Sequence, residues 1–199
     1  MDKQQIGKET PIIRILGVDP GTQITGYGII EINGNEPVLI TCGVLRLARL
    51  SDDAAVRLSR LFHRLNGLIE EFNPNQFAIE APFYAKNVQS TLKLGRAQGV
   101  ALAAALAHNL EIFEYAPRKV KKSTTGRGDA SKEQVAAMIA RLLPELGEHP
   151  DSHVPDATDA LAVALCHHMQ QGARFSVKKK SNDWSAFLTD HPNRVLSRK

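Results

Sequence analysis

The order of its regular segments constrains the fold of this chain more than any other feature of the sequence. Three apolar, β-branched runs come first, at residues 12–18, 26–32 and 38–47. The connections between them are short, which favours antiparallel pairing of successive strands. The Asn33-Gly34-Asn35 segment between the second and third runs is typical of a hairpin turn. The sequence therefore predicts that the sheet begins as a three-stranded meander.

Helical and strand-like segments alternate from residue 52 onward. Apolar residues recur at helical spacing until Asn73 and Pro74. Strands are predicted at 76–80 and 111–115, and further helices at 90–108, 131–143 (capped by Ser131 or Asp129) and 155–169. The resulting order, β-β-β-α-β-α-β-α-α, resembles that of the ribonuclease-H-like architecture, which sugar-kinase and actin ATPases share. We therefore expect an α/β fold with a mixed five-stranded sheet flanked by helices.

Composition excludes several classes of protein. The 199 residues are 43% hydrophobic and 23% charged, as expected for one domain with a full core, or one domain plus a tail. The longest apolar run, residues 100–107, is far shorter than the ~20 residues of a membrane span. No apolar signal core follows Met1, and Cys42 and Cys166 lack metal-type spacing. We expect a cytoplasmic protein with reduced cysteines and no membrane partner.

The net charge of +4 comes from the end of the chain. Residues 172–199 hold seven Lys and Arg against two acidic residues, so the rest of the chain is close to neutral. We expect a polar leader at 1–11, a folded domain at 12–171 and a basic tail at 172–199. A second basic stretch, from Glu114 to Lys132, holds six basic and two acidic residues. A solvated charged face is the more ordinary interpretation of it until an acidic partner is placed nearby.

Four carboxylates are expected at one edge of the sheet. Asp19 ends the first predicted strand and Glu80 ends the fourth, and these strands can be parallel neighbours. Open α/β sheets bind ligands at the carboxyl ends of such strands. Asp156 and Asp159 share one face at the start of the last helix. Alone, Asp19 is an ordinary turn residue and Asp156 suits a helix N-terminus; together the four form a candidate site.

Such a cluster calls for cations. Carboxylates within ~4–6 Å repel each other by about 1 kcal/mol per pair in water, and by several times more at lower dielectric. Oxygen ligands suit Mg²⁺ or Mn²⁺. Two such ions ~4 Å apart cut phosphodiesters, because one activates water while the other stabilises the leaving oxygen. Asp19, on the central strand, is the carboxylate expected to reach both ions.

Histidines contribute weaker candidates. His167 and His168 stand beside Cys166, but adjacent helical residues point about 100° apart and no second cluster completes a zinc site. His153 lies three residues before Asp156 and could act there as an acid, base or ligand. A plain loop histidine is the more ordinary interpretation.

Five motifs in order give the chain a specific family resemblance. They are residues 19–22 with 25–28, residues 78–80 with 83–87, residues 92–97, residues 113–117 with 120–122, and residues 156–162. Taken together over about residues 12–170, they resemble the RuvC family of Holliday-junction resolvases. The resemblance implies a homodimeric, Mg²⁺-dependent endonuclease that resolves four-way DNA junctions by symmetric paired nicks in recombination and repair. It also implies two ions per subunit, Mn²⁺ as a substitute for Mg²⁺, and the branch-migration proteins RuvA and RuvB as partners.

Carried over by motif, the resemblance assigns roles to seven residues. The catalytic and metal-binding set is Asp19, Glu80, Asp156 and Asp159, and the DNA-binding set is Phe83, Lys121 and Lys132. Phe83 matches the aromatic that stacks on an unpaired junction base, a contact worth ~1–3 kcal/mol. The two lysines match residues on the DNA backbone, and each phosphate neutralised adds ~0.9 to the salt slope.

Competing interpretations stay open on the sequence alone. The 19–22 segment could be the phosphate loop of a phosphotransferase, although such enzymes usually need a second domain. A catalytically silent junction binder is a second alternative, although all four acidic positions are acids here. A general ribonuclease H would share the metal site, and Phe83 is what argues for junctions. The basic tail could be a DNA-binding arm or a solubility segment. Gly95, Gly99 and Ala103 recur at four-residue spacing, for packing on the chain's own sheet or for a dimer contact.

Overall fold

One mixed sheet organises the part of the chain that the computed structural model describes, residues 12–48, 53–81 and 88–176. The strands are β1 (Ile13–Asp19), β2 (Ile24–Asn33), β3 (Glu36–Arg46), β4 (Gln76–Glu80) and β5 (Glu111–Tyr115). Their order across the sheet is β3-β2-β1-β4-β5. β1, β2 and β3 pair antiparallel, and β4 lies parallel to both β1 and β5. The predicted meander and the predicted parallel pairing of the first and fourth strands are confirmed.

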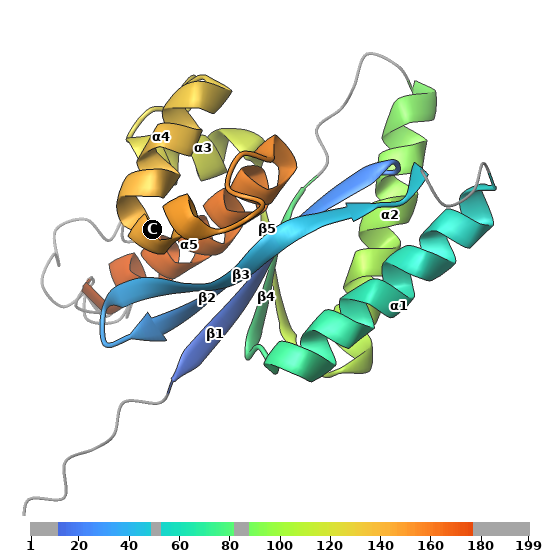
Figure 1. Ribbon diagram of the computed structural model, residues 1–199, viewed down its shortest axis with the longest axis horizontal. Coiled ribbons are helices and arrows are strands. Elements are labelled where there is room, and N and C mark those ends of the chain that lie inside the picture. Colours follow the sequence, from blue (N-terminus) through green and yellow to red (C-terminus); the bar gives the residue numbers. More distant parts are fainter. Residues whose placement is uncertain (1–11, 49–52, 82–87, 177–199) are drawn as a thin grey trace, which may run out of the picture.

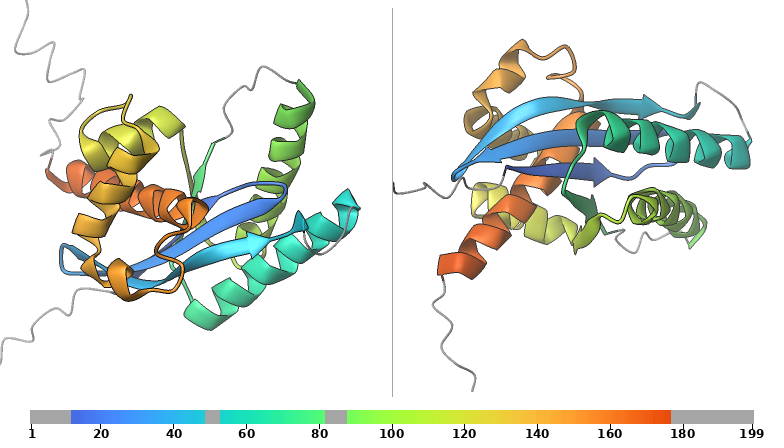
Figure 2. Two further views of the ribbon diagram at one scale, coloured as in Figure 1. Left: turned by 45° about the horizontal axis from the view of Figure 1, so that its top comes forward. Right: turned by 90° about the horizontal axis from the view of Figure 1, so that it is seen from below.

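Helices cover both faces of the sheet (Figure 1). Helices α1 (Ala54–Phe72) and α2 (Val88–Ala107) pack on one face. On the other face lies α5 (Pro155–Ser176), with α3 (Pro117–Thr125), α4 (Lys132–Leu142) and the short 3-10 helix η2 (Pro144–Glu148) around it. Figure 2 shows this separation of the helices from two further directions. Each face has its own hydrophobic core, with Leu65 and Phe77 on the first and Leu161 and Ile139 on the second.

Local signals in the sequence explain most element ends. Asp53 caps α1 by accepting a hydrogen bond from the Ala55 amide, and Asn73 ends it in the left-handed conformation. Ser131, rather than Asp129, caps α4 through a reciprocal capping box with Gln134. These caps satisfy backbone groups that helix ends otherwise leave without partners.

Two helices differ from the prediction. Helix α3 was not expected, because its nine residues are mostly charged or polar and include one large apolar side chain, Val120. Its signal in the sequence is Pro117 in the first turn together with Gly126 just past the last. Helix α5 runs on to Ser176 instead of ending at residue 169. The expected leader and the chain from residue 177 lie outside the described residues.

The described ranges contain neither a candidate membrane-spanning helix nor a disulfide. No helix there is long and apolar enough to cross a membrane. Cys42 and Cys166 are both buried free thiols.

Candidate active site

Asp19 and Glu80 end neighbouring strands at the centre of the sheet. The register pairs Val18 of β1 with Ile79 of β4, so the next residue on each parallel strand is one of these two carboxylates. Both side chains are partly buried and line the same cavity, which has a volume of about 240 Å³. The structure thus brings together the two strand residues that the sequence singled out.

Helix α5 brings the other two carboxylates to the same edge. Pro155 begins the helix and puts Asp156 and Asp159 in its first turns. The helix approaches the strands closely because glycines lie at the points of contact. A Cβ at Gly26 would collide with the Asp156 carbonyl oxygen, and a Cβ at Gly17 would collide with the Ala160 carbonyl oxygen. Asp159 lines the cavity with Asp19 and Glu80, whereas Asp156 is outside the described lining.

The carboxylates influence one another electrostatically. The pKa of Asp19 is raised to about 7, first by burial and then by the charges of Glu80, Asp159 and Asp156. The pKa of Glu80 is also raised to about 7, by burial and then by Asp159. Without a metal, the cluster therefore has too little positive charge nearby for all of its carboxyl groups to be ionised at neutral pH. The charge of Asp156 on Asp19 shows that all four acids belong to one cluster.

Two lysines partly offset this negative charge. Lys132 Nζ lies 2.7 Å from Asp159 Oδ2, and the hydrogen bond between them raises the pKa of Lys132. Lys121 lines the cavity, and its charge, like that of Lys132, lowers the pKa of Glu80. Lys132 is two-thirds exposed and so can also face a ligand in solvent.

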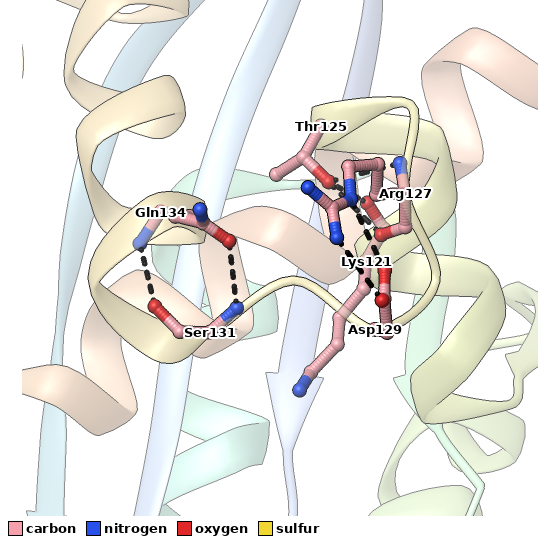
Figure 3. Close-up of polar contacts among 6 residues, drawn as sticks. All are labelled: Lys121, Thr125, Arg127, Asp129, Ser131 and Gln134. Carbon is pink, nitrogen blue, oxygen red and sulfur yellow. Dashed lines mark hydrogen bonds and ion pairs between the residues drawn. The ribbon is translucent and has the colours of Figure 1, made fainter.

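The connection between α3 and α4 positions both lysines (Figure 3). The Thr125 hydroxyl donates to the Lys121 carbonyl oxygen at 2.8 Å and accepts from the Arg127 amide at 3.2 Å. Arg127 in turn forms an ion pair with Asp129. The Ser131–Gln134 capping box then starts α4 immediately before Lys132. Sequence reasoning missed this scaffold because it missed α3.

Two other predicted residues have different outcomes. Phe83 lies outside the described residues. His153 lies exposed in the turn before α5, and the described lining of the cavity does not include it.

The chemistry of the donors fits a hard divalent cation. The acids that converge here all offer carboxylate oxygens, the ligands that Mg²⁺ and Mn²⁺ prefer. Their raised pKa values reflect a shortage of positive charge that a bound cation would relieve. Within the described ranges, no group of three or more His, Cys, Asp and Glu side chains is arranged to hold a metal as it stands. The carboxylates would therefore have to adjust their side chains to share an ion.

Comparison with known proteins identifies the family. The family model described as crossover junction endodeoxyribonuclease RuvC matches residues 15–167. This chain belongs to the RuvC family. Its curated relatives include the RuvC of Cytophaga hutchinsonii, 53% identical over 181 residues that cover 91% of this chain and 87% of the relative. The RuvC of Porphyromonas gingivalis is 50% identical over 185 residues, covering 91% of this chain and 96% of the relative.

A solved RuvC structure has the same fold. The Thermus thermophilus RuvC in complex with a Holliday junction substrate matches with a TM-score of 0.73 and 28% identity, over 81% of this chain and 96% of the other. The expected ribonuclease-H-like fold is therefore confirmed. The resemblance to the RuvC family is confirmed by sequence and by structure.

Proposed function

We propose that this RuvC family member is an endonuclease that resolves four-way (Holliday) DNA junctions, with the cavity between β1, β4 and α5 as its catalytic centre. The observation that carries the proposal is the meeting of Asp19, Glu80 and Asp159 with Lys121 and Lys132 around one cavity. Phosphodiester hydrolysis needs acids that can hold a metal ion and cations that can bind the phosphate, and both kinds of side chain line this cavity. The relatives that match along most of this chain are named as crossover junction endodeoxyribonucleases.

The chain's own side chains would divide the work. The lysines offset the charge of the DNA backbone and hold the scissile phosphate against the carboxylates. Asp19, Glu80, Asp156 and Asp159 would hold the metal, and the central place of Asp19 suits it to the largest share. A divalent ion bound there supplies a water of lowered pKa and neutralises charge on the phosphate. Mg²⁺, at two ions per subunit and replaceable by Mn²⁺, fits the all-oxygen donor set.

We infer that the enzyme works as a homodimer through an exposed stripe on α2. Val88, Leu92 and Leu106 are among the most exposed large apolar residues of the described chain. Gly95 and Gly99 lie between them, and a Cβ at either position would meet nothing within 4 Å. Packing on the chain's own sheet therefore does not account for these glycines. A second copy does, because glycines allow two helices to approach closely and a two-fold junction needs two active sites.

The dimer proposal has a direct test. Gly99→Leu should convert the dimer to a monomer in light scattering at micromolar concentration. Gly67→Leu is the matched control, since Gly67 is also a helix residue with open space around it but lies on α1. A wild-type chain that stays monomeric with and without junction DNA would contradict the proposal.

Two further parts of the proposal concern partners and DNA. We expect RuvA and RuvB to act with this protein, as the family resemblance implies. We also expect Phe83 to stack on a junction base, since it follows Glu80 by three residues. Phe83→Ala should weaken junction binding by ~1–3 kcal/mol without changing duplex binding.

Cleavage of a labelled mobile junction, with a linear duplex of the same sequence alongside, tests the catalytic centre. We expect Mg²⁺-dependent paired nicks in the junction alone, and no nicks in EDTA. Asp19→Asn and Glu80→Gln should cut on the order of 10³-fold more slowly or worse while still binding. Glu148→Gln, an exposed acid in η2, is the matched control and should cut normally. Binding without cleavage by the wild-type chain would point to the silent junction binder instead.

A further inference from the structure

A second basic surface lies on the face of the sheet opposite the catalytic cavity. A cleft of about 380 Å³ opens between the N-terminal halves of α1 and α2, and we call it the α1–α2 cleft. Its described lining carries three cations, Arg57, Lys93 and Arg96, and no carboxylate. The cleft therefore has the charge of a site for an anion.

The cations of the cleft have no acidic partner in the described part of the chain. The salt bridges found there join Arg14 to Glu31, Arg127 to Asp129 and Lys132 to Asp159, and none involves a residue of the cleft. Their positive charge is thus available to a ligand.

The charges of α1 point to the same conclusion. Arg57 and Arg60 lie in its N-terminal half and Arg64 just past its middle, whereas Glu70 and Glu71 lie in its last turn. This distribution opposes the helix dipole, so it does not help to stabilise the free helix. It concentrates positive charge at the end of α1 that borders the cleft.

The floor of the cleft connects directly to the catalytic centre. Thr22 and Gln23 line the cleft and belong to the turn that follows Asp19. The turn is fixed in place, because the Gln23 carbonyl oxygen accepts hydrogen bonds from the amides of Leu47 and Ala48 at 2.8 and 3.1 Å. Three residues of chain span at most about 10 Å, so the backbone of Thr22 lies no more than about 10 Å from that of Asp19. The cleft therefore begins close to the catalytic centre.

We propose that the α1–α2 cleft binds a second backbone phosphate of the same junction, a few nucleotides from the scissile phosphate. The proposal rests on the proposed function, since it takes the scissile phosphate to lie at Asp19. It assigns Arg57, Lys93 and Arg96 to DNA binding and leaves the chemistry to the opposite face. On a helical projection of α2, Lys93 lies about 100° from Leu92 and so faces away from the proposed dimer stripe, whereas Arg96 lies about 40° from Leu92 and borders the stripe.

Binding measured in EDTA over a series of salt concentrations tests the cleft separately from cleavage. The triple variant Arg57→Gln, Lys93→Gln, Arg96→Gln should lower the salt slope of junction binding by about 0.9, because the cleft neutralises one phosphate, and Lys93→Gln alone should lower it by less. Arg141→Gln removes the same charge from the exposed end of α4 and should leave the slope unchanged. A triple variant with the wild-type slope would overturn the proposal.

Neutral backbone linkages test the position of the contact on the DNA. When single methylphosphonates are placed in turn at the positions near the cut, one position beyond the scissile phosphate should weaken binding by the unaltered chain, whereas the same linkage should cost the triple variant little. Equal losses in both proteins at every position would overturn the proposal. If the triple variant lowers the salt slope but the unaltered chain does not cut junctions, the cleft proposal stands and the proposed function is refuted. If the unaltered chain cuts junctions but the triple variant has the wild-type slope, the proposed function stands and the cleft proposal is refuted.

Discussion

The two faces of the sheet are built by different kinds of packing. On the α5 face, Gly17 and Gly26 leave room for the backbone of α5 to touch the strands, and alanines line the helix. On the α1–α2 face, bulky side chains such as Leu61, Leu65 and Phe77 fill the space between helix and sheet. Backbone contact tolerates little displacement, whereas side-chain packing can relax. The face that needs fixed carboxylates is therefore the one built on glycine.

The same substitution on each face tests this comparison most strongly. Gly26→Ala places a Cβ against the Asp156 carbonyl oxygen, so α5 must shift. We expect a loss of about 3 kcal/mol in the free energy of unfolding and a large loss of junction cleavage. Urea denaturation and the cleavage assay measure the two effects. Wild-type stability and activity for Gly26→Ala would show that α5 does not depend on this contact.

The charge cluster gives the α5 face its own dependence of stability on pH. The pKa of Asp19 is about 7 in the folded chain and near 3.8 when unfolded, so the folded state binds the proton more tightly. The stability that this proton contributes is fully present below pH 4 and is lost as the pH rises through 7. In the metal-free wild-type protein, we expect titration of Asp19 to lower the free energy of unfolding by on the order of 3 kcal/mol between pH 4.5 and 8. Asp19→Asn should abolish this fall, because it removes the carboxyl group that titrates.

Denaturation curves of both proteins at these two pH values, in EDTA, provide the measurement. Asp53→Asn, at the cap of α1, is the control on the other face. It should leave the slope of stability against pH between 4.5 and 8 as in the wild type. An equally steep slope in Asp19→Asn would contradict the electrostatic account of the cluster.

The matched glycine on the α1–α2 face should respond in the opposite direction from Gly26. Gly67 lies inside α1 with nothing within 4 Å of a new Cβ. Gly67→Ala should therefore raise the free energy of unfolding by ~0.8–1 kcal/mol, because alanine favours the helix. Destabilisation by this substitution, measured in the same urea titration, would remove the contrast between the faces.

The smallest effect on stability is expected at the rim of the catalytic cavity. Lys132→Gln breaks an ion pair whose lysine is two-thirds exposed, so the free energy of unfolding should change by no more than about 0.5–1 kcal/mol. Cleavage should fall much further, because we propose that the lysine also contacts the DNA backbone. Parallel loss of both would indicate that Lys132 is mainly a structural residue.

The features that were predicted correctly from the sequence are those that local residue patterns determine. The strands at 76–80 and 111–115 were predicted at their observed ends, and the hairpin and the neighbouring ends of β1 and β4 follow from turn chemistry and strand order. The strand ends and the hairpin depend on residues close together in the chain, whereas the parallel pairing of β1 with β4 was inferred from the order of the strands. The close meeting of Asp19 and Glu80 follows from them directly.

The remaining features depend on how distant segments pack. Helix α3 was missed because its nine residues are mostly charged or polar, and the α3–α4 scaffold behind Lys121 was missed with it. The close contacts of Gly17 and Gly26 with α5 join residues that are more than a hundred positions apart in the chain. The α1–α2 cleft likewise forms only when two helices from different parts of the chain lie side by side.

Titration of the Asp19 carboxyl by nuclear magnetic resonance, with and without Mg²⁺, tests most directly that these acids share one cation site. We predict a pKa of about 7 in metal-free protein, and a fall of the pKa well below this value at saturating Mg²⁺, because the bound charge favours the carboxylate. An Asp19 that titrates near its ordinary value without metal, or whose pKa Mg²⁺ does not change, would contradict the account.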